Sequence, residues 1–268
     1  MKVHHINAGA MQPYGGALFD GQTPGLGPAT LACHCLVLET GAGLVLVDTG
    51  TVSRDAVASA ARLSPFFRTI DRIRLLPGEA AANQIRALKL DPGDVKHVVM
   101  THLDFDHAAG LIDFPAARVH LSAAEAATAQ SPVSPKDRGR YRPAQWGDQA
   151  RFHTYGTFAA DFFGVRASFL DDVPGLMLVQ LPGHTPGHCG VAVDTGRGWL
   201  LHAADAIFHH RELDPVAPHT PTGARALQWL MQSNQVQRRR SLAHLRRIRR
   251  DHEHHVQIVC THDPSFFK

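Results

Sequence analysis

Apolar and polar positions along the chain follow two patterns, one typical of strands and one typical of helices. Short runs rich in branched apolar residues predict strands, and longer segments whose apolar residues recur every three or four positions predict helices. The expected strands are Val3–Ile6, Leu31–Glu39, Leu44–Val47, Val95–Met100, Arg118–Leu121, Leu176–Leu181, Gly190–Val193, Trp199–His202 and Gln257–Cys260. The expected helices are Ser53–Arg62, Glu79–Leu90, Ser122–Ala129, 223–231 and 235–253. Strands that alternate with helices in both halves of the chain indicate an α/β protein.

Two segments interrupt this alternation of strands and helices. Residues 9–30 are rich in glycine and proline, which predicts a long loop, and a long loop of this kind is often functional. Residues 131–172 combine prolines and glycines with many aromatic side chains. This second segment is either a wall of a substrate pocket or a surface excursion with a small core of its own, and the sequence leaves both readings open.

Length and composition restrict the classes of protein to consider. With 268 residues, we expect a single domain over residues 1–268. A net charge of +3 argues against a dedicated nucleic-acid-binding protein, and the arginine-rich helix 235–253 is expected to expose a solvated outer face. Without an apolar run of membrane-span length or a signal-peptide pattern, we expect a cytoplasmic protein that contacts no membrane. A homodimer is compatible with the sequence. The four cysteines are expected to be buried thiols rather than disulfides.

Potential metal ligands are most concentrated in the stretch Thr101–His107, directly after an expected strand. Four potential metal ligands, His102, Asp104, Asp106 and His107, fall within six residues. The first two share a face of an extended segment, and the next two can reach a neighbouring point once the chain turns. Imidazole suits zinc and iron, and a carboxylate can bridge two ions. The stretch is either a metal site or a solvated polar turn, and the rest of the chain decides between them.

The stretch resembles the His-x-His-x-Asp-His signature of the metallo-β-lactamase-fold hydrolases, with Asp104 in place of the second histidine. Further elements similar to that family follow in its order. Asp48 comes at the end of an early strand, and His184 lies in a Pro-Gly-His-Thr-Pro-Gly-His loop. Asp205 follows a later strand, and His262 follows the last one. The resemblance implies a four-layer αβ/βα sandwich, the metallo-β-lactamase fold.

The resemblance also implies two divalent metal ions, most simply Zn2+, with manganese or iron as alternatives. The implied ligands form two sets bridged by Asp205: His102, Asp104 and His184 for the first ion, and Asp106, His107 and His262 for the second. Asp48 is expected to orient ligands rather than bind an ion, and His188 is expected to support the site in a similar way.

Two such ions can activate a shared water for hydrolysis, and Asp106 and Asp205 are the expected catalytic residues. The pattern is most similar to the small lactonase branch, so the expected substrate is an ester- or lactone-type bond of a small molecule. Lactonases of that branch commonly have a tyrosine three residues after the bridging aspartate, where this chain has Phe208. Phosphotriester and β-lactam hydrolysis are the alternatives within the class. A non-hydrolytic di-iron redox or metal-binding protein is the alternative outside it.

Asp104 alters the expected charge of the centre. Two divalent ions carry four positive charges, while three ligand carboxylates and one hydroxide carry four negative charges, so the cluster would be neutral. A histidine at this position would leave one positive charge. A neutral cluster lowers the pKa of its bound water less, so the sequence predicts that hydroxide forms at higher pH. It also predicts that the site binds manganese or iron more readily than a site with histidine at this position would.

Overall fold

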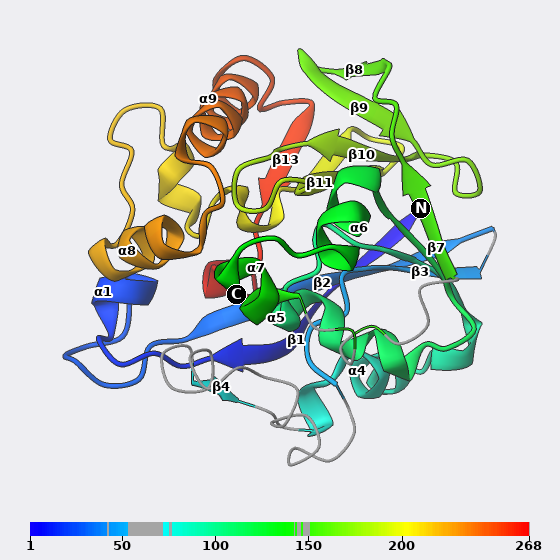
Figure 1. The fold of residues 1–268 in the computed structure, drawn as a ribbon, viewed down its shortest axis with the longest axis horizontal. Coiled ribbons are helices and arrows are strands. Elements are labelled where there is room, and N and C mark those ends of the chain that lie inside the picture. The colour runs from blue at the N-terminus through cyan, green and yellow to red at the C-terminus, as the bar shows by residue number, and fades with distance from the viewer. Residues whose placement is uncertain are drawn as a thin grey trace.

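The computed structural model describes residues 1–41, 43–52, 72–74, 77–141, 143, 146 and 151–267, and its strands form two facing sheets (Figure 1). The first sheet has the order β4-β1-β2-β3-β5-β6-β7, and the second has the order β13-β12-β11-β10-β9-β8. The first sheet contains β1 (Lys2–Met11), β2 (Leu31–Thr40), β3 (Gly43–Val47), β4 (Ile73–Arg74), β5 (Val95–Val99), β6 (Arg118–Ser122) and β7 (Phe152–Tyr155). The second contains β8 (Ala160–Phe162), β9 (Val165–Phe169), β10 (Leu176–Gln180), β11 (Cys189–Asp194), β12 (Trp199–His202) and β13 (Val256–Val259).

Parallel pairing brings the candidate ligands to one edge of each sheet. The expected hairpin forms between β2 and β3, and β3 then pairs with β5 in parallel. The carboxyl ends of parallel strands meet at the same edge, so Asp48 after β3 lies beside the stretch Thr101–His107 after β5. In the second sheet β12 and β13 are parallel, and they deliver Asp205 and His262 in the same way.

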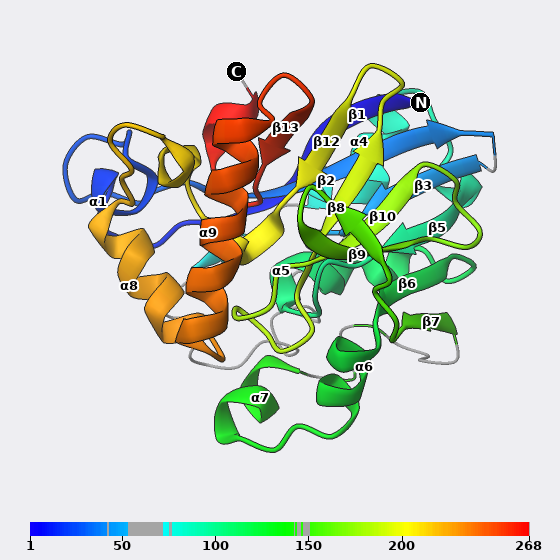
Figure 2. The same ribbon diagram turned by 90° about the horizontal axis from the view of Figure 1, so that it is seen from above.

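Helices cover the outer faces of the two sheets (Figure 2). The α-helices among the described residues are α1 (Ala17–Asp20), α4 (Ala81–Ala87), α5 (Phe105–Ala108), α6 (Ala123–Gln130), α7 (Pro135–Arg140), α8 (Thr222–Met231) and α9 (Gln235–Asp251). Ile85 of α4 belongs to a buried cluster on the outer face of the first sheet, and Leu245 of α9 belongs to one on the second sheet. A third cluster, which includes Leu178, fills the space between the sheets. The order helix, sheet, sheet, helix confirms the expected four-layer αβ/βα sandwich.

The first strand differs from its prediction. The sequence predicted a short strand over Val3–Ile6, but β1 runs from Lys2 to Met11, with a register irregularity between Asn7 and Ala10. Its last two residues also pair with β4. The loop rich in glycine and proline therefore starts later than predicted, and it contains the short helix α1.

The segment 131–172 is more regular than its composition indicates. It contains α7, β7, β8 and β9, and its aromatic side chains extend the main cores. Trp146 packs in the cluster on the first sheet, Tyr155 packs between the sheets, and Phe162 packs on the second sheet. The reading of this segment as an aromatic substrate wall is therefore wrong, and the aromatic residues form no separate small core either.

Three other expectations can be compared with the structure. All four cysteines are buried and free, as expected. The helix expected over Ser53–Arg62 lies outside the described residues. Among the residues that are described, no helix is both long enough and apolar enough to cross a membrane.

Candidate metal centre

The seven expected ligands converge where the strands of both sheets end. After β5 the chain bends at Thr101, Asp104 is extended, and the backbone then turns into α5, whose single turn carries Asp106 and His107. This change of direction lets side chains that are adjacent in sequence approach one region from two sides. Six of the seven side chains are buried, and Asp106 is half-buried.

The first group consists of His102, Asp104 and His184. Nε2 of His184 lies 2.9 Å from Oδ2 of Asp104, and Nε2 of His102 lies 3.4 Å from the same oxygen. The three residues offer ligand atoms that all lie within 4.8 Å of one another. Asp104 therefore points into the cluster rather than away from it.

The second group consists of Asp106, His107 and His262. Oδ2 of Asp106 lies 3.4 Å from Nε2 of His107 and 3.5 Å from Nε2 of His262. These three residues again offer atoms within 4.8 Å of one another. The structure thus brings together the two sets of ligands that the resemblance implies, and it also places His102, His107 and Asp205 within 4.8 Å of one another.

Asp205 lies between the two groups and contacts both. Its Oδ1 is 3.3 Å from Nε2 of His107, while its Oδ2 is 3.1 Å from Nε2 of His262 and 3.5 Å from Nε2 of His184. Nε2 of His188 accepts a hydrogen bond from the backbone N–H of Asp205 at 3.1 Å. His188 therefore fixes the backbone that presents this carboxylate.

The far ring nitrogens of His102, His107 and His262 have protein partners, whereas Nδ1 of His184 has none among the described residues. Nδ1 of His107 lies 2.7 Å from Oδ2 of Asp48. The same Oδ2 accepts a hydrogen bond from the hydroxyl of Thr101, and Oδ1 of Asp48 accepts one from the backbone N–H of Thr101. Asp48 has φ 54°, an uncommon conformation for a residue other than glycine, so the fold holds it in place at some cost. Nδ1 of His262 donates to the carbonyl oxygen of Ala32 at 2.8 Å. Where such a partner is present, it sets the tautomer of the histidine and directs its Nε2 into the cluster.

Several buried atoms of the cluster have no hydrogen-bond partner among the described residues: Nε2 of His102, Nε2 of His107, Oδ2 of Asp106 and Oδ1 of Asp205. A buried polar atom left unpaired costs free energy, so a cluster of such atoms calls for another partner. Four imidazoles and three carboxylates are donors suited to divalent ions of the zinc, manganese and iron type. The residues present therefore fit a two-ion centre.

Glu125 is a site residue that the sequence did not identify. The sequence placed it only in the first turn of the helix expected over Ser122–Ala129, and its backbone N–H does donate to Ser122 Oγ at 3.1 Å. Its buried carboxylate, however, accepts from the backbone N–H of Leu103 at 3.0 Å and from the hydroxyl of Thr185 at 2.6 Å. Glu125 thereby ties the stretch that carries His102 to the loop that carries His184.

Arg140, at the end of α7, is the second residue that the sequence did not identify. Its side chain is buried, and its Nε lies 2.8 Å from Oδ1 of Asp104. Neither atom makes an aligned hydrogen bond to a described residue, so the contact is an ion pair. Nη1 and Nη2 donate to the carbonyl oxygens of His184 at 2.9 Å and Met231 at 2.6 Å.

The Arg140 guanidinium corrects the charge count made from the sequence. A cluster with Asp104 and no partner would be neutral, but Arg140 adds one positive charge in direct contact. The total returns to the single positive charge expected with a histidine at that position. The predicted rise in the pH of hydroxide formation is therefore not expected.

Electrostatics keep the carboxylates of the cluster ionised. Burial alone would raise the pKa of Asp104, but Arg140 and His102 hold that pKa well below its usual range. Burial would also raise the pKa of Asp205, yet His262 and His107 hold it well below its usual range. The cluster therefore presents negative charge to a cation.

A pocket opens directly above the cluster. Its polar floor is formed by Asp104, Asp106, Arg140, His184, Asp205 and His262, and its apolar walls are formed by Met11, Ile73, Phe105, Phe208, Leu227 and Met231. The ring of Phe208 contacts the ring of His262 with centroids 4.7 Å apart. The walls thus come from β1, β4, α5, α8 and the segment after β12, and not from the aromatic residues of 131–172.

Comparison with known proteins identifies similar chains. A family model described as the metallo-beta-lactamase superfamily matches residues 29–247. A probable metallo-hydrolase of Mycobacterium tuberculosis is 39% identical over 270 residues, which cover 100% of this chain and 82% of that protein. An N-acyl homoserine lactonase of Bacillus cereus is 26% identical over 228 residues, which cover 81% of this chain and 80% of that protein.

Solved structures give the same picture for the fold. The structure of a mutant of AiiA from B. thuringiensis, with N-decanoyl-L-homoserine bound at the active site, aligns with a TM-score of 0.73 and 20% identity. The alignment covers 99% of this chain and 94% of that one. At this identity the similarity concerns the fold.

Proposed function

The chain belongs to the metallo-beta-lactamase superfamily, and we propose that this metal-dependent hydrolase cleaves ester- or lactone-type bonds of small, largely apolar molecules. The observation that carries the proposal is the seven-residue ligand cluster at the floor of a pocket with apolar walls. The similarity to N-acyl homoserine lactonases supports the choice of bond.

In this proposal two divalent ions, most simply Zn2+, bind to the two groups of ligands. His102, Asp104 and His184 hold one ion, Asp106, His107 and His262 hold the other, and Asp205 contacts both. When bound, the ions would lower the pKa of a water molecule and polarise the bond under attack. The partners of the far ring nitrogens, among them Asp48, keep the Nε2 atoms in position for this task.

Asp106 is placed to handle the proton of the reaction. It is the one half-buried carboxylate of the cluster, and it lines the pocket. Hydrolysis joins the water oxygen to the acyl carbon and breaks the bond from that carbon to the leaving oxygen, which must then gain a proton. The Asp106 carboxylate can accept the proton from the water and return it to the leaving oxygen.

The walls of the pocket indicate which molecules would enter. Met11, Phe105, Phe208 and Leu227 offer apolar surface, while the charged groups lie at the floor. A neutral substrate with an apolar acyl or alkyl group would bury its chain against these walls and expose its ester to the ligand cluster. Small charged esters would gain little from the same walls.

A hydrolysis screen tests this proposal. Pure protein loaded with Zn2+ is offered lactones and esters of increasing chain length, together with phosphotriesters and β-lactams, while bound metal is measured in the same samples. Lactone or ester turnover that improves with chain length is expected, and it should be lost in Asp106→Asn and kept in the exposed control Asp94→Asn. Turnover of phosphotriesters or β-lactams alone would contradict the proposed substrate class.

A further inference from the structure

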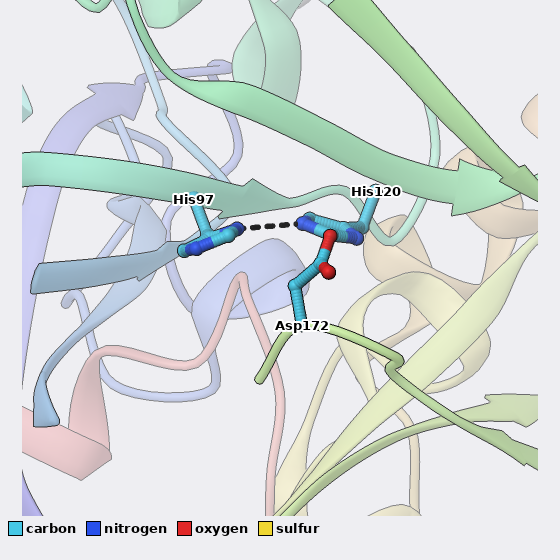
Figure 3. Close-up of side chains that lie close together, drawn as sticks. All are labelled: His97, His120 and Asp172. Carbon is cyan, nitrogen blue, oxygen red and sulfur yellow. Dashed lines mark hydrogen bonds between the residues drawn. The ribbon is translucent and has the colours of Figure 1, made fainter. Parts of the chain in front are cut away.

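A second cluster of potential metal ligands lies outside the centre described above. His97 on β5 and His120 on β6 project from the same face of the first sheet, because His120 lies opposite Val99 and Val99 is two positions after His97. Asp172, in the segment between β9 and β10 of the second sheet, points toward them (Figure 3). The three residues share no member with the candidate metal centre.

The donor atoms of this cluster already face one another. Nδ1 of His97 and Nε2 of His120 are 2.9 Å apart, and a carboxylate oxygen of Asp172 completes a set within 4.8 Å (Figure 3). Two imidazole nitrogens bound to one tetrahedral zinc ion would lie about 3.3 Å apart, since each Zn–N bond is about 2.0–2.1 Å. The two rings would need to separate by only about half an ångström to accept such an ion.

His120 and Asp172 each have a second partner that would orient them. Nδ1 of His120 lies 3.0 Å from the hydroxyl of Tyr155, which also accepts the backbone N–H of Asp171 at 3.3 Å. A proton on Nδ1 that is donated to Tyr155 leaves the lone pair of Nε2 free for an ion. Arg118 pairs with Oδ2 of Asp172 and so leaves the other carboxylate oxygen available.

Both histidines are in the protonation state that a metal requires. His120 is fully buried, and burial together with the neighbouring His97 and His153 lowers its pKa to about 4. Burial lowers the pKa of His97 as well. Near neutral pH both rings are therefore uncharged and able to act as ligands.

We propose that His97, His120 and Asp172 form a site for one divalent transition-metal ion of the zinc type, separate from the hydrolytic centre. Two imidazoles and one carboxylate are ligands that such ions prefer, and a water molecule would take the remaining position. Because the histidines belong to the first sheet and Asp172 belongs to the second half of the chain, the ion links the two sheets. Its role is to stabilise the sandwich, and this role does not depend on which substrate the enzyme hydrolyses.

The stoichiometry of bound zinc tests this site. Full-length wild type, His97→Asn and Asp172→Asn are saturated with Zn2+ under the same conditions, dialysed against buffered free Zn2+, and measured by elemental analysis. The wild type should carry one Zn2+ per chain more than either variant, whatever the occupancy of the hydrolytic centre. The variant His254→Asn, whose side chain is 90% exposed, controls for zinc on surface histidines and should match the wild type.

Thermal unfolding provides a second measurement that does not depend on activity. Free Zn2+ at about 100 times the dissociation constant should raise the Tm of the wild type by roughly 5–10 °C more than that of either variant. Equal zinc content and equal Tm shifts in wild type and variants would overturn the proposal and leave a hydrogen-bonded histidine pair. Asp172→Asn is a substitution of a partly exposed side chain, so the test does not depend on a variant with a damaged core.

Discussion

The contact between Asp104 and Arg140 predicts that these two residues can be exchanged only together. Replacing Asp104 by histidine, the residue usual in the family signature, would leave the Arg140 guanidinium buried without its ion-pair partner. Replacing Arg140 by methionine would likewise leave the Asp104 carboxylate buried without its ion-pair partner. The double variant, Asp104→His with Arg140→Met, removes both charges and restores the usual ligand type.

The structure gives a scale for this effect. At 2.8 Å and an effective dielectric constant of about 20, the two charges attract each other by about 6 kcal/mol, before the cost of removing them from water. Removing one partner of a buried pair costs about 3–5 kcal/mol, because the other charge stays buried and unpaired. Each single variant should therefore lose about that much free energy of unfolding, and the double variant should lose about 2–4 kcal/mol less than the sum of the two.

Urea unfolding of metal-stripped protein measures this coupling without reference to activity. Arg140→Met also loses the hydrogen bonds to the carbonyl oxygens of His184 and Met231, but the double variant loses them too, so they cancel in the cycle. Arg138→Met, on the same helix and exposed, is the control and should stay close to the wild type. Additive losses in the double variant would show that Arg140 does not compensate for the charge of Asp104.

Four further predictions concern other parts of the protein. Asp205→Ala should reduce bound metal at the hydrolytic centre from about two ions toward one in elemental analysis, and an unchanged content would contradict a bridging role. Phe208→Tyr should raise kcat/KM for lactones about fivefold if the added hydroxyl donates to the substrate carbonyl, and no change would mean that another group polarises it. Glu125→Gln should lower the free energy of unfolding by about 1.5–3 kcal/mol in urea, because charge-assisted hydrogen bonds to both ligand segments are weakened. The pKa of His120 is about 4 in the folded protein, so its contribution to the free energy of unfolding of metal-free protein should be fully present above about pH 6.5 and fall by up to about 3 kcal/mol as the pH drops toward 4. The free energy of unfolding of His120→Gln should fall less over this range, and parallel curves for wild type and variant would refute this role of His120.

The elements of the fold could largely be predicted from the sequence because their signals are local. The hairpin of β2 and β3 and the helix α9 follow from residues within each segment. The segment 131–172 was harder to interpret, because aromatic residues such as Trp146 and Tyr155 favour burial in any apolar environment. Whether they line a pocket or fill a core depends on contacts with strands that are distant in the sequence.

The positions of the expected ligands came from the resemblance to the family signature, and in the fold each of them follows a strand or lies in a short turn. His102 and Asp104 are fixed relative to each other by their spacing, and the parallel pairing of strands brings the remote ligands to the same edge. No local sequence pattern identifies the residues that contact these ligands. Glu125 has the local signature of a helix cap, and only the fold shows that its carboxylate contacts Leu103 and Thr185.

Arg140 shows what a ligand signature leaves out. The signature specifies the type and spacing of the atoms that can hold an ion, but it does not specify the net charge of the pocket. The chain has 27 lysines and arginines, so a carboxylate at position 104 does not indicate which of them, if any, compensates for it. The structure selects Arg140 because its guanidinium is buried against Asp104 while its other nitrogens are held by backbone carbonyls. The same reasoning predicts that relatives with histidine at position 104 have no buried cation facing it, and relatives that combine that histidine with a buried arginine there would contradict it.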